Sequence, residues 1–240
     1  MRVKNKKSFR IAIISIIAAV SLFVVGFYVY TLDYYRADTF AVQTIAANEK
    51  HIKSQDGITV FYPDAGNDKG SALIFYPGGK VEAEAYAPLL ERLSEKGITC
   101  LLVRMPFNLA VFDVNAADRI YSKFPGIVNW YIGGHSLGGA MASSYADKNT
   151  DKIKGLILLG AYSVGATDIP TLAIYGSNDG VLDRSKLEGT DNVLEIAGGN
   201  HAYFGNYGEQ KGDGKAEITR EQQQENTAEA ITDFIYEKTE

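Results

Sequence analysis

Hydrophobic residues in this 240-residue chain gather into short continuous runs that are mostly separated by stretches with helical spacing. The runs typical of buried strands cover residues 72–76, 98–103, 130–132, 156–159 and 171–175, and a last strand is expected over residues 192–197. Helical spacing is clearest in Tyr86, Leu89, Leu90 and Leu93, and Gly97 closes that helix. Continuous apolar strands that alternate with helices predict an α/β fold, with a mainly parallel central sheet and helices on both faces.

Other elements are expected before, within and after this alternation. A hairpin is expected over residues 51–62, because two β-like runs flank Asp56-Gly57. Short helices are expected over residues 40–47 and 115–124. A terminal helix should begin at residues 219–222, which have the form of a capping box and precede an apolar helical face.

The N-terminal segment has the composition of a membrane span. Residues 11–32 are 22 successive uncharged residues after a basic stretch, and in a helix they would cross a bilayer core of about 30 Å. We therefore expect a cytoplasmic basic tail and transmembrane signal-anchor over residues 1–32. A juxtamembrane linker over residues 33–48 and one domain over residues 49–240 would follow. Basic flanks stay in the cytoplasm, which predicts an extracytoplasmic domain.

A cleaved signal peptide, which would make the domain a secreted one, is the alternative interpretation of this segment. The apolar stretch is long and no clear small-x-small cleavage site follows it, so an uncleaved anchor is favoured. Both interpretations predict that the domain is exported.

Charge is distributed unevenly along the chain. The net charge is −5, and the first 32 residues carry five basic and no acidic groups, so the remainder has a net charge of −10. An acidic domain of this kind argues against nucleic acid as a partner. Cys100 is the only cysteine and lies in an apolar run, so we expect a buried small hydrophobic residue and no intrachain disulfide.

The segment Gly134-His135-Ser136-Leu137-Gly138 lies between an expected strand and an expected helix. This is the context of a nucleophile elbow, in which a serine on a sharp strand-to-helix turn projects its hydroxyl. The residues two before and two after that serine need to be nearly free of side chain, and glycine stands at both positions. A glycine-rich turn in which Ser136 only caps the helix is the alternative interpretation.

With this motif in a parallel sheet, the chain from about residue 58 to residue 236 resembles an α/β-hydrolase. It is most similar to the small bacterial members without a lid, of the dienelactone-hydrolase and carboxylesterase-like kind. The resemblance implies a catalytic triad in the chain order serine, acid, histidine. It also implies a serine nucleophile at Ser136, which needs a base within hydrogen-bond reach.

Three histidines are candidates for the base. His135 adjoins Ser136, and on a tight elbow its side chain should point away from that of the serine. His51 lies in the early hairpin and is expected at the surface. His201 follows the last expected strand in a glycine-flanked loop, which matches the position of the base in the family. The alternative interpretation is that His201 is a loop residue that only caps a neighbouring element and has no catalytic role.

The family resemblance also implies the acid and the oxyanion donors. Asp179 follows the strand at residues 171–175 and would hold the histidine in its tautomer, with Asp183 as the alternative acid. The backbone N–H of Leu137 would be one oxyanion donor. The second would come from the loop after residues 72–76, from the amide of Gly79 or that of Lys80.

Connection lengths bear on the shape of the pocket. Ten residues separate Leu159 from Pro170, which leaves no room for a lid or cap, so we expect an open and shallow pocket. The longest irregular stretch, residues 205–216, follows His201 and is expected near the site. It lacks the ligand spacing of an EF-hand loop, and we predict no metal and no cofactor.

These features predict a serine hydrolase that cleaves a carboxylic ester or related acyl bond through an acyl-serine intermediate. Its partners would be a small-molecule ester or acyl substrate and the membrane, reached through the N-terminal helix. Two alternatives remain open: a hydrolase of peptide or cell-wall substrates, and a catalytically idle α/β-hydrolase fold that serves as a binding module.

Overall fold

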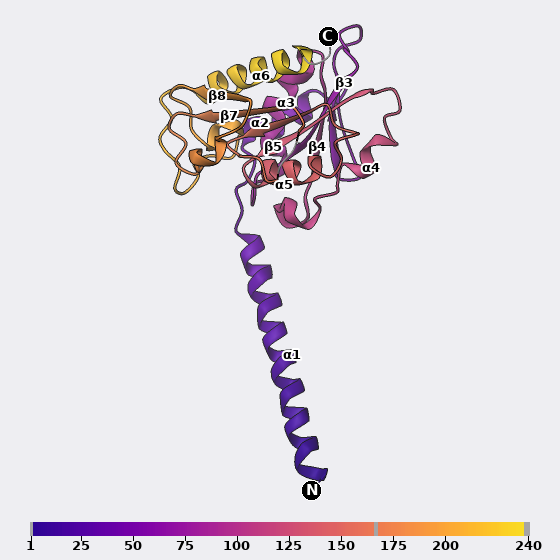
Figure 1. The fold of residues 1–240 in the computed structure, drawn as a ribbon, viewed down its shortest axis with the longest axis vertical. Coiled ribbons are helices and arrows are strands. Elements are labelled where there is room, and N and C mark those ends of the chain that lie inside the picture. Colours follow the sequence, from indigo (N-terminus) through magenta and orange to yellow (C-terminus); the bar gives the residue numbers. More distant parts are fainter. Residues whose placement is uncertain (1, 166–167, 238–240) are drawn as a thin grey trace. The chain divides into compact units, whose positions relative to one another are not determined.

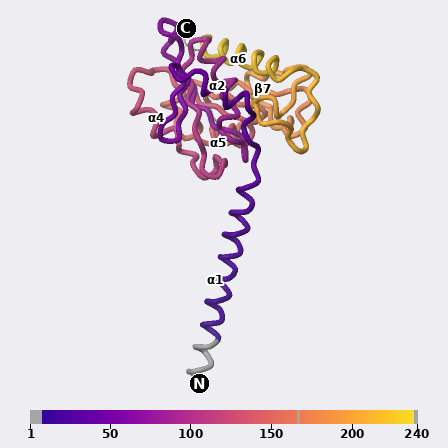
Figure 2. The backbone as a smooth tube through the Cα atoms, turned by 180° about the vertical axis from the view of Figure 1, so that it is seen from behind, coloured from indigo at the N-terminus to yellow at the C-terminus, as the bar shows by residue number. Residues whose placement is uncertain are grey.

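The computed structural model describes residues 2–165 and 168–237, with side chains from residue 8 onward. The chain divides into two compact units, residues 1–34 and residues 35–240 (Figures 1 and 2). The first unit consists of one helix, α1 (Arg2–Leu32). Its segment Ser8–Leu32 has 25 residues and contains an 18-residue stretch with a mean hydropathy of 2.6, so it is long and apolar enough to cross a membrane.

The second unit is built on one eight-stranded sheet in the order β1-β2-β4-β3-β5-β6-β7-β8. β1 pairs with β2 and β2 with β4 in antiparallel fashion, and all other neighbours are parallel. The strands are β1 (Ile52–Gln55), β2 (Ile58–Phe61), β3 (Ser71–Tyr76), β4 (Thr99–Val103), β5 (Asn129–His135), β6 (Gly155–Leu159), β7 (Thr171–Gly176) and β8 (Asn192–Ile196). The predicted α/β fold with a mainly parallel sheet is therefore confirmed.

Helices cover both faces of this sheet. α2 (Thr39–Ala47), α3 (Ala87–Glu95) and α6 (Arg220–Glu237) pack on one face, and α4 (Asp118–Tyr121) and α5 (Leu137–Ala146) on the other. Five short 3₁₀ turns complete the described elements: η1 (Ala83–Tyr86), η2 (Pro106–Asn108), η3 (Ala110–Phe112), η4 (Arg184–Leu187) and η5 (Ala202–Phe204). Thr219 and Gln222 exchange the two hydrogen bonds of a capping box where α6 begins.

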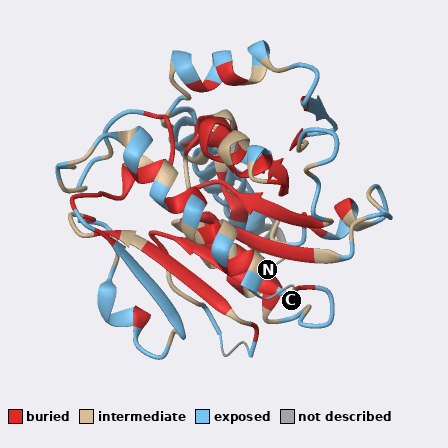
Figure 3. Ribbon diagram, turned by 90° about the horizontal axis from the view of Figure 1, so that it is seen from above, coloured by how far each residue is buried: buried red, intermediate tan, exposed pale blue. Residues whose placement is uncertain are grey.

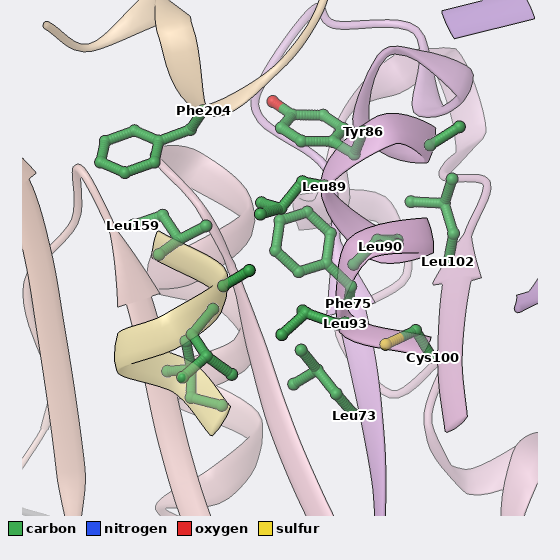
Figure 4. Close-up of a cluster of buried hydrophobic side chains, with 14 of the residues drawn as sticks. Leu73, Phe75, Tyr86, Leu89, Leu90, Leu93, Cys100, Leu102, Leu159 and Phe204 are labelled. Carbon is green, nitrogen blue, oxygen red and sulfur yellow. The ribbon is translucent and has the colours of Figure 1, made fainter. Parts of the chain in front are cut away.

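The core has two layers because successive side chains of a strand point to opposite faces of the sheet. In β3, Leu73 and Phe75 join the cluster under α3 and α6 (Figure 4), whereas Ile74 and Tyr76 join the cluster under α5. All four side chains are fully buried, and the central strands are buried along their length (Figure 3). Burying one such side chain contributes about 1.5–3 kcal/mol, so the central strands are held firmly and their carboxyl ends form a rigid base.

The helix expected over residues 115–124 is much shorter in the structure. Only Asp118–Tyr121 forms α4, and the residues before it form turns. The hydroxyl of Tyr76 donates to the carbonyl of Val114 and accepts the amide of Ala117, at 2.9 Å each. These tertiary hydrogen bonds compete with helical ones, and Pro125 and Gly126 follow shortly after the helix.

The compact unit begins at Tyr35, before the expected domain boundary at residue 49. The amide of Tyr35 donates to the carbonyl of Lys80 at 2.7 Å, and the amide of Glu82 donates to the carbonyl of Tyr35 at 2.9 Å. α2 then packs on α3, and its Ala41 is fully buried. Residues 35–48 are therefore part of the folded domain, and only residues 33 and 34 connect it to α1.

Candidate active site

Ser136 occupies the sharp turn between β5 and α5. Its φ of 52° and ψ of −122° lie outside the ordinary regions for a residue with a side chain. Its amide donates to the carbonyl of Leu159 in β6 at 2.9 Å, which ties the turn to the neighbouring strand. Such a conformation costs about 1–3 kcal/mol and persists only where the surroundings enforce it. The turn has the geometry that the sequence motif predicted.

The glycines of the motif are needed for close backbone approach. A Cβ on Gly134 would lie 2.5 Å from the carbonyl oxygen of Tyr76. A Cβ on Gly138 would overlap the carbonyl oxygens of both Tyr76 and Pro77. Backbone atoms cannot move aside as flexible side chains do, so both positions exclude any residue with a Cβ.

His201 and Asp179 form a buried pair. Nδ1 of His201 lies 2.8 Å from Oδ2 of Asp179, and the two residues are 0% and 5% exposed. Oδ1 of Asp179 accepts the amides of Val181 at 2.8 Å and Leu182 at 2.9 Å. Burial acts to raise the pKa of Asp179, but the hydrogen bond and charge of His201 and the two amides outweigh it, so the pKa is lowered.

Asp183, the alternative acid, makes no hydrogen bond to the ring of His201 in the part of the chain that the structure describes. Its carboxylate accepts the amide and the hydroxyl of Ser185, at 3.2 and 2.7 Å, and it caps η4. Asp183 instead lies at the wall of the cavity beside Ser136. Of the two candidate acids, only Asp179 is in position to orient His201.

A cavity of about 340 Å³ lies at the carboxyl ends of the parallel strands, and both Ser136 and His201 line it. Its walls include the apolar side chains of Leu137, Ala161 and Val181. Nε2 of His201 is buried and has no hydrogen-bond partner in the part of the chain that the structure describes. The ring atom suited to accept a proton is thus free beside the cavity that Ser136 lines.

The loop after β3 lies against the start of α5. The amide of Gly78 donates to the hydroxyl of Tyr86 at 3.0 Å, and the amide of Lys80 donates to the carbonyl of Asn108 at 2.7 Å. Between them, the amide of Gly79 donates to no residue that the structure describes. A Cβ on Gly79 would lie 2.8 Å from Cδ2 of Leu137, so the two expected donor residues are neighbours. This geometry favours Gly79 over Lys80 as the second donor.

Hydrogen bonds through the side chains of Tyr86 and His135 hold the loop after β3 in place, a role that the sequence did not reveal. The hydroxyl of Tyr86 lies 2.8 Å from Nδ1 of His135 while it accepts the amide of Gly78. The rings of His135 and His201 have centroids 4.4 Å apart. Burial, together with the charge of His201, lowers the pKa of His135 well below its usual value, so His135 remains neutral.

Two further residues at the site were not singled out from the sequence. Gly160 follows β6 with a φ of +51°, and a Cβ there would lie 2.8 Å from Nδ1 of His201. Asp213 accepts the amides of Gly180, His201 and Ala202 at 3.2, 3.1 and 2.8 Å, which holds the acid-bearing and histidine-bearing loops together. The position of Gly160 at the end of a strand was the available signal for that residue. Asp213 lies in the loop of residues 205–216 that was expected near the site, but its hydrogen bonds to the two loops were not predicted.

The carboxylates near the start of α3 are occupied by local contacts. Glu82 accepts the amide of Ala37 at 2.9 Å, and Glu84 pairs with Arg104. Within residues 2–165 and 168–237, no group of three or more His, Cys, Asp or Glu side chains is arranged to hold a metal ion.

Replacing Tyr86 with phenylalanine is expected to lower the kcat of the reaction catalysed at this site about 10- to 100-fold with little change in KM. The variant leaves the Gly78 amide without its acceptor, and small displacements of catalytic groups have effects of this size. Tyr76→Phe is the matched control, since its hydroxyl also makes two buried hydrogen bonds but fixes residues 114–117. Steady-state kinetics and thermal unfolding of both variants test this; an equal loss of kcat in both would contradict it.

Comparisons with known proteins agree with this architecture. Residues 72–225 match the model of a family described as "Alpha/beta hydrolase family". Est1E from Butyrivibrio proteoclasticus has a similar structure, with 17% identity and a TM-score of 0.56 over 77% of this chain and 98% of that one.

Two further solved structures share the fold. TT1662 from Thermus thermophilus has 14% identity and a TM-score of 0.55, over 76% of this chain and 93% of that one. A dienelactone hydrolase from Anabaena variabilis has 16% identity and a TM-score of 0.53, over 75% of this chain and 90% of that one. No curated protein matches by sequence.

Proposed function

Because the chain belongs to the α/β-hydrolase family, we propose that it cleaves a carboxylic ester or related acyl bond through an acyl-serine intermediate. The observation that carries this proposal is the His201–Asp179 pair, with a 2.8 Å contact, at the cavity that Ser136 also lines. A fold that served only for binding would have no need of a nucleophile, base and acid in this arrangement.

In the proposed reaction, the hydroxyl oxygen of Ser136 attacks the carbonyl carbon of the ester while Nε2 of His201 takes the hydroxyl proton. Asp179 keeps the proton of the neutral ring on Nδ1, so that Nε2 can accept, and stabilises the imidazolium that forms. His201 then donates the proton to the leaving alcohol. Water then attacks the acyl-serine while Nε2 of His201 takes one of its protons, and the histidine returns that proton to the oxygen of Ser136 as the carboxylic acid leaves.

The amides of Gly79 and Leu137 would stabilise the oxyanion of each tetrahedral intermediate. Each amide lacks a partner among the described residues, and the two residues are adjacent. Each preorganised donor of this kind lowers the activation free energy by about 3–4 kcal/mol, because it needs no reorientation as negative charge develops on the oxygen.

We further propose that α1 anchors the enzyme in the membrane with the domain on the extracytoplasmic face. The apolar segment Ser8–Leu32 supports the anchor, and the basic residues before it support the orientation. The domain would act there on small-molecule esters or acyl compounds.

A fluorophosphonate probe tests this function, because it reacts with an activated serine whatever the natural substrate. We expect mass spectrometry of the labelled full-length protein to place the adduct on the peptide that contains Ser136. A panel of p-nitrophenyl esters and peptides would then separate ester from peptide hydrolysis. A folded protein that is neither labelled nor active on the panel would favour the catalytically idle alternative.

A further inference from the structure

Three large apolar side chains are exposed on the segment after β4. Phe107, Val111 and Phe112 are 52%, 45% and 51% exposed, and the rings of Phe107 and Phe112 make an edge-on contact with centroids 5.7 Å apart. We call these three residues the aromatic rim. Contiguous apolar side chains on a surface mark an interaction site more often than single ones do.

The aromatic rim adjoins the candidate active site. The carbonyl of Asn108, next to Phe107, accepts the amide of Lys80 in the loop that carries Gly79. η3, which carries Val111 and Phe112, packs against α5 behind the nucleophile. Both the rim and the cavity of Ser136 therefore lie at the carboxyl-end edge of the sheet, where Val181 adds another exposed apolar side chain at the cavity wall.

The backbone at the start of the rim has an unusual conformation. Phe107 and Asn108 both have a φ of 55°, a left-handed conformation that costs a phenylalanine about 1–2 kcal/mol, whereas asparagine adopts it more readily. The carboxylate that follows the rim, Asp113, is paired with Arg119 at 2.6 Å. The surface at this edge of the sheet therefore combines exposed aromatic rings with a carboxylate whose charge is balanced by an arginine.

The covalent chain brings a lipid surface within reach of this edge, however the two units are oriented. The apolar segment of α1 ends at Leu32, and Tyr35 is already hydrogen-bonded to Lys80 and Glu82. Three residues of chain span at most about 11 Å. An anchor at Leu32 thus tethers the same loop that Asn108, the residue next to Phe107 of the aromatic rim, holds by a hydrogen bond.

We propose that the aromatic rim is a lipid-docking surface, through which the carboxyl-end edge of the sheet rests on the membrane. Aromatic side chains are well suited to the membrane–water interface, where their rings sit at the level of the head groups. The occupant is a phospholipid surface. Resting on the proposed esterase function, this docking implies an amphiphilic acyl ester that enters the cavity of Ser136 from the bilayer.

Site-directed spin labelling of the full-length protein in phosphatidylcholine–phosphatidylglycerol vesicles tests the docking. Val111→Cys places a nitroxide on the rim, and Val128→Cys places one at the amino end of β5, where Val128 is 72% exposed. Burial covers Cys100 and raises the pKa of its thiol, so the native cysteine should not react. The wild-type protein controls for background labelling.

The expected result is a several-fold higher ratio of oxygen to nickel-chelate accessibility at position 111 than at position 128, because oxygen concentrates in lipid. Flotation with the vesicles shows first that the helix is inserted, and protein that fails to float would contradict the proposed anchor. A water-like ratio at both positions in protein that floats with the vesicles would overturn the docking. None of these outcomes depends on hydrolysis, so failure of the docking and failure of the esterase proposal are distinguishable.

A kinetic measurement tests the implied substrate. Phe112→Ser should lower the rate on a vesicle-embedded acyl ester, relative to that on p-nitrophenyl acetate, about tenfold, a ratio that corresponds to 1.4 kcal/mol of lost interaction. Val128→Ser is the matched control and should leave that ratio unchanged. An unchanged ratio in Phe112→Ser would overturn delivery of the substrate from the bilayer.

Discussion

Replacing Ser136 with alanine is expected to lower kcat for p-nitrophenyl acetate and butyrate by about 10⁵- to 10⁶-fold, the size of effect seen when a triad nucleophile is removed. Alanine has no hydroxyl to form the acyl intermediate, whereas its small side chain suits the turn that serine occupies. The residual rate would come from the oxyanion donors and substrate binding alone. Stopped assays at high enzyme concentration would measure it.

Two controls accompany this variant. Thermal unfolding and circular dichroism should show a fold like that of the wild type, because the amide of residue 136 still donates to Leu159. Ser54→Ala, in the exposed β1 hairpin, should keep wild-type turnover. If Ser136→Ala retained more than a tenth of the wild-type kcat, Ser136 would not be the nucleophile.

Replacing Asp179 with asparagine is expected to lower kcat about 10⁴-fold at neutral pH with the fold preserved. The asparagine carbonyl can still accept the amides of Val181 and Leu182, which leaves its NH₂ group facing Nδ1 of His201. That group is a donor only, so it favours the tautomer with the proton on Nε2. His201 then cannot accept the proton of Ser136.

Asp183→Asn is the matched control, since Asp183 lies at the same cavity but caps η4. We expect it to change kcat by less than tenfold, and kinetics of both variants from pH 5 to pH 9 would separate the two aspartates. Comparable losses in the two variants would show that Asp179 does not act by orienting His201.

Local patterns were sufficient for the secondary structure and the elbow. The continuous apolar runs of β3, β6 and β7 predict strands buried on both faces, and the structure has them there. Gly134 and Gly138 were expected to allow close approach, and the carbonyl oxygens of Tyr76 at the end of β3 and of Pro77 just after it do lie against them. Such features depend on periodicity and on the absence of a Cβ, both of which are local properties.

The sequence also identified Ser136, Asp179 and His201 as candidates, because their chain order matches the serine, acid, histidine order that the resemblance to an α/β-hydrolase implies. The carboxyl ends of parallel strands meet at one edge of the sheet, so residues that are far apart in the chain come together. Their catalytic roles remain predictions that the variants above would test.

Tertiary structure alone decided the remaining features of the site. Whether Gly79 or Lys80 keeps a free amide depends on Asn108, which is distant in sequence and accepts the Lys80 amide. Tyr86 and Asp213 act on backbone amides that reach them through the fold, and no local pattern encodes such contacts. Tyr35 likewise joins the domain through hydrogen bonds to residues 80 and 82, which composition could not reveal. Periodicity and glycine placement are readable from the sequence because they are local, whereas hydrogen bonds between loops exist only once the sheet has brought those loops together.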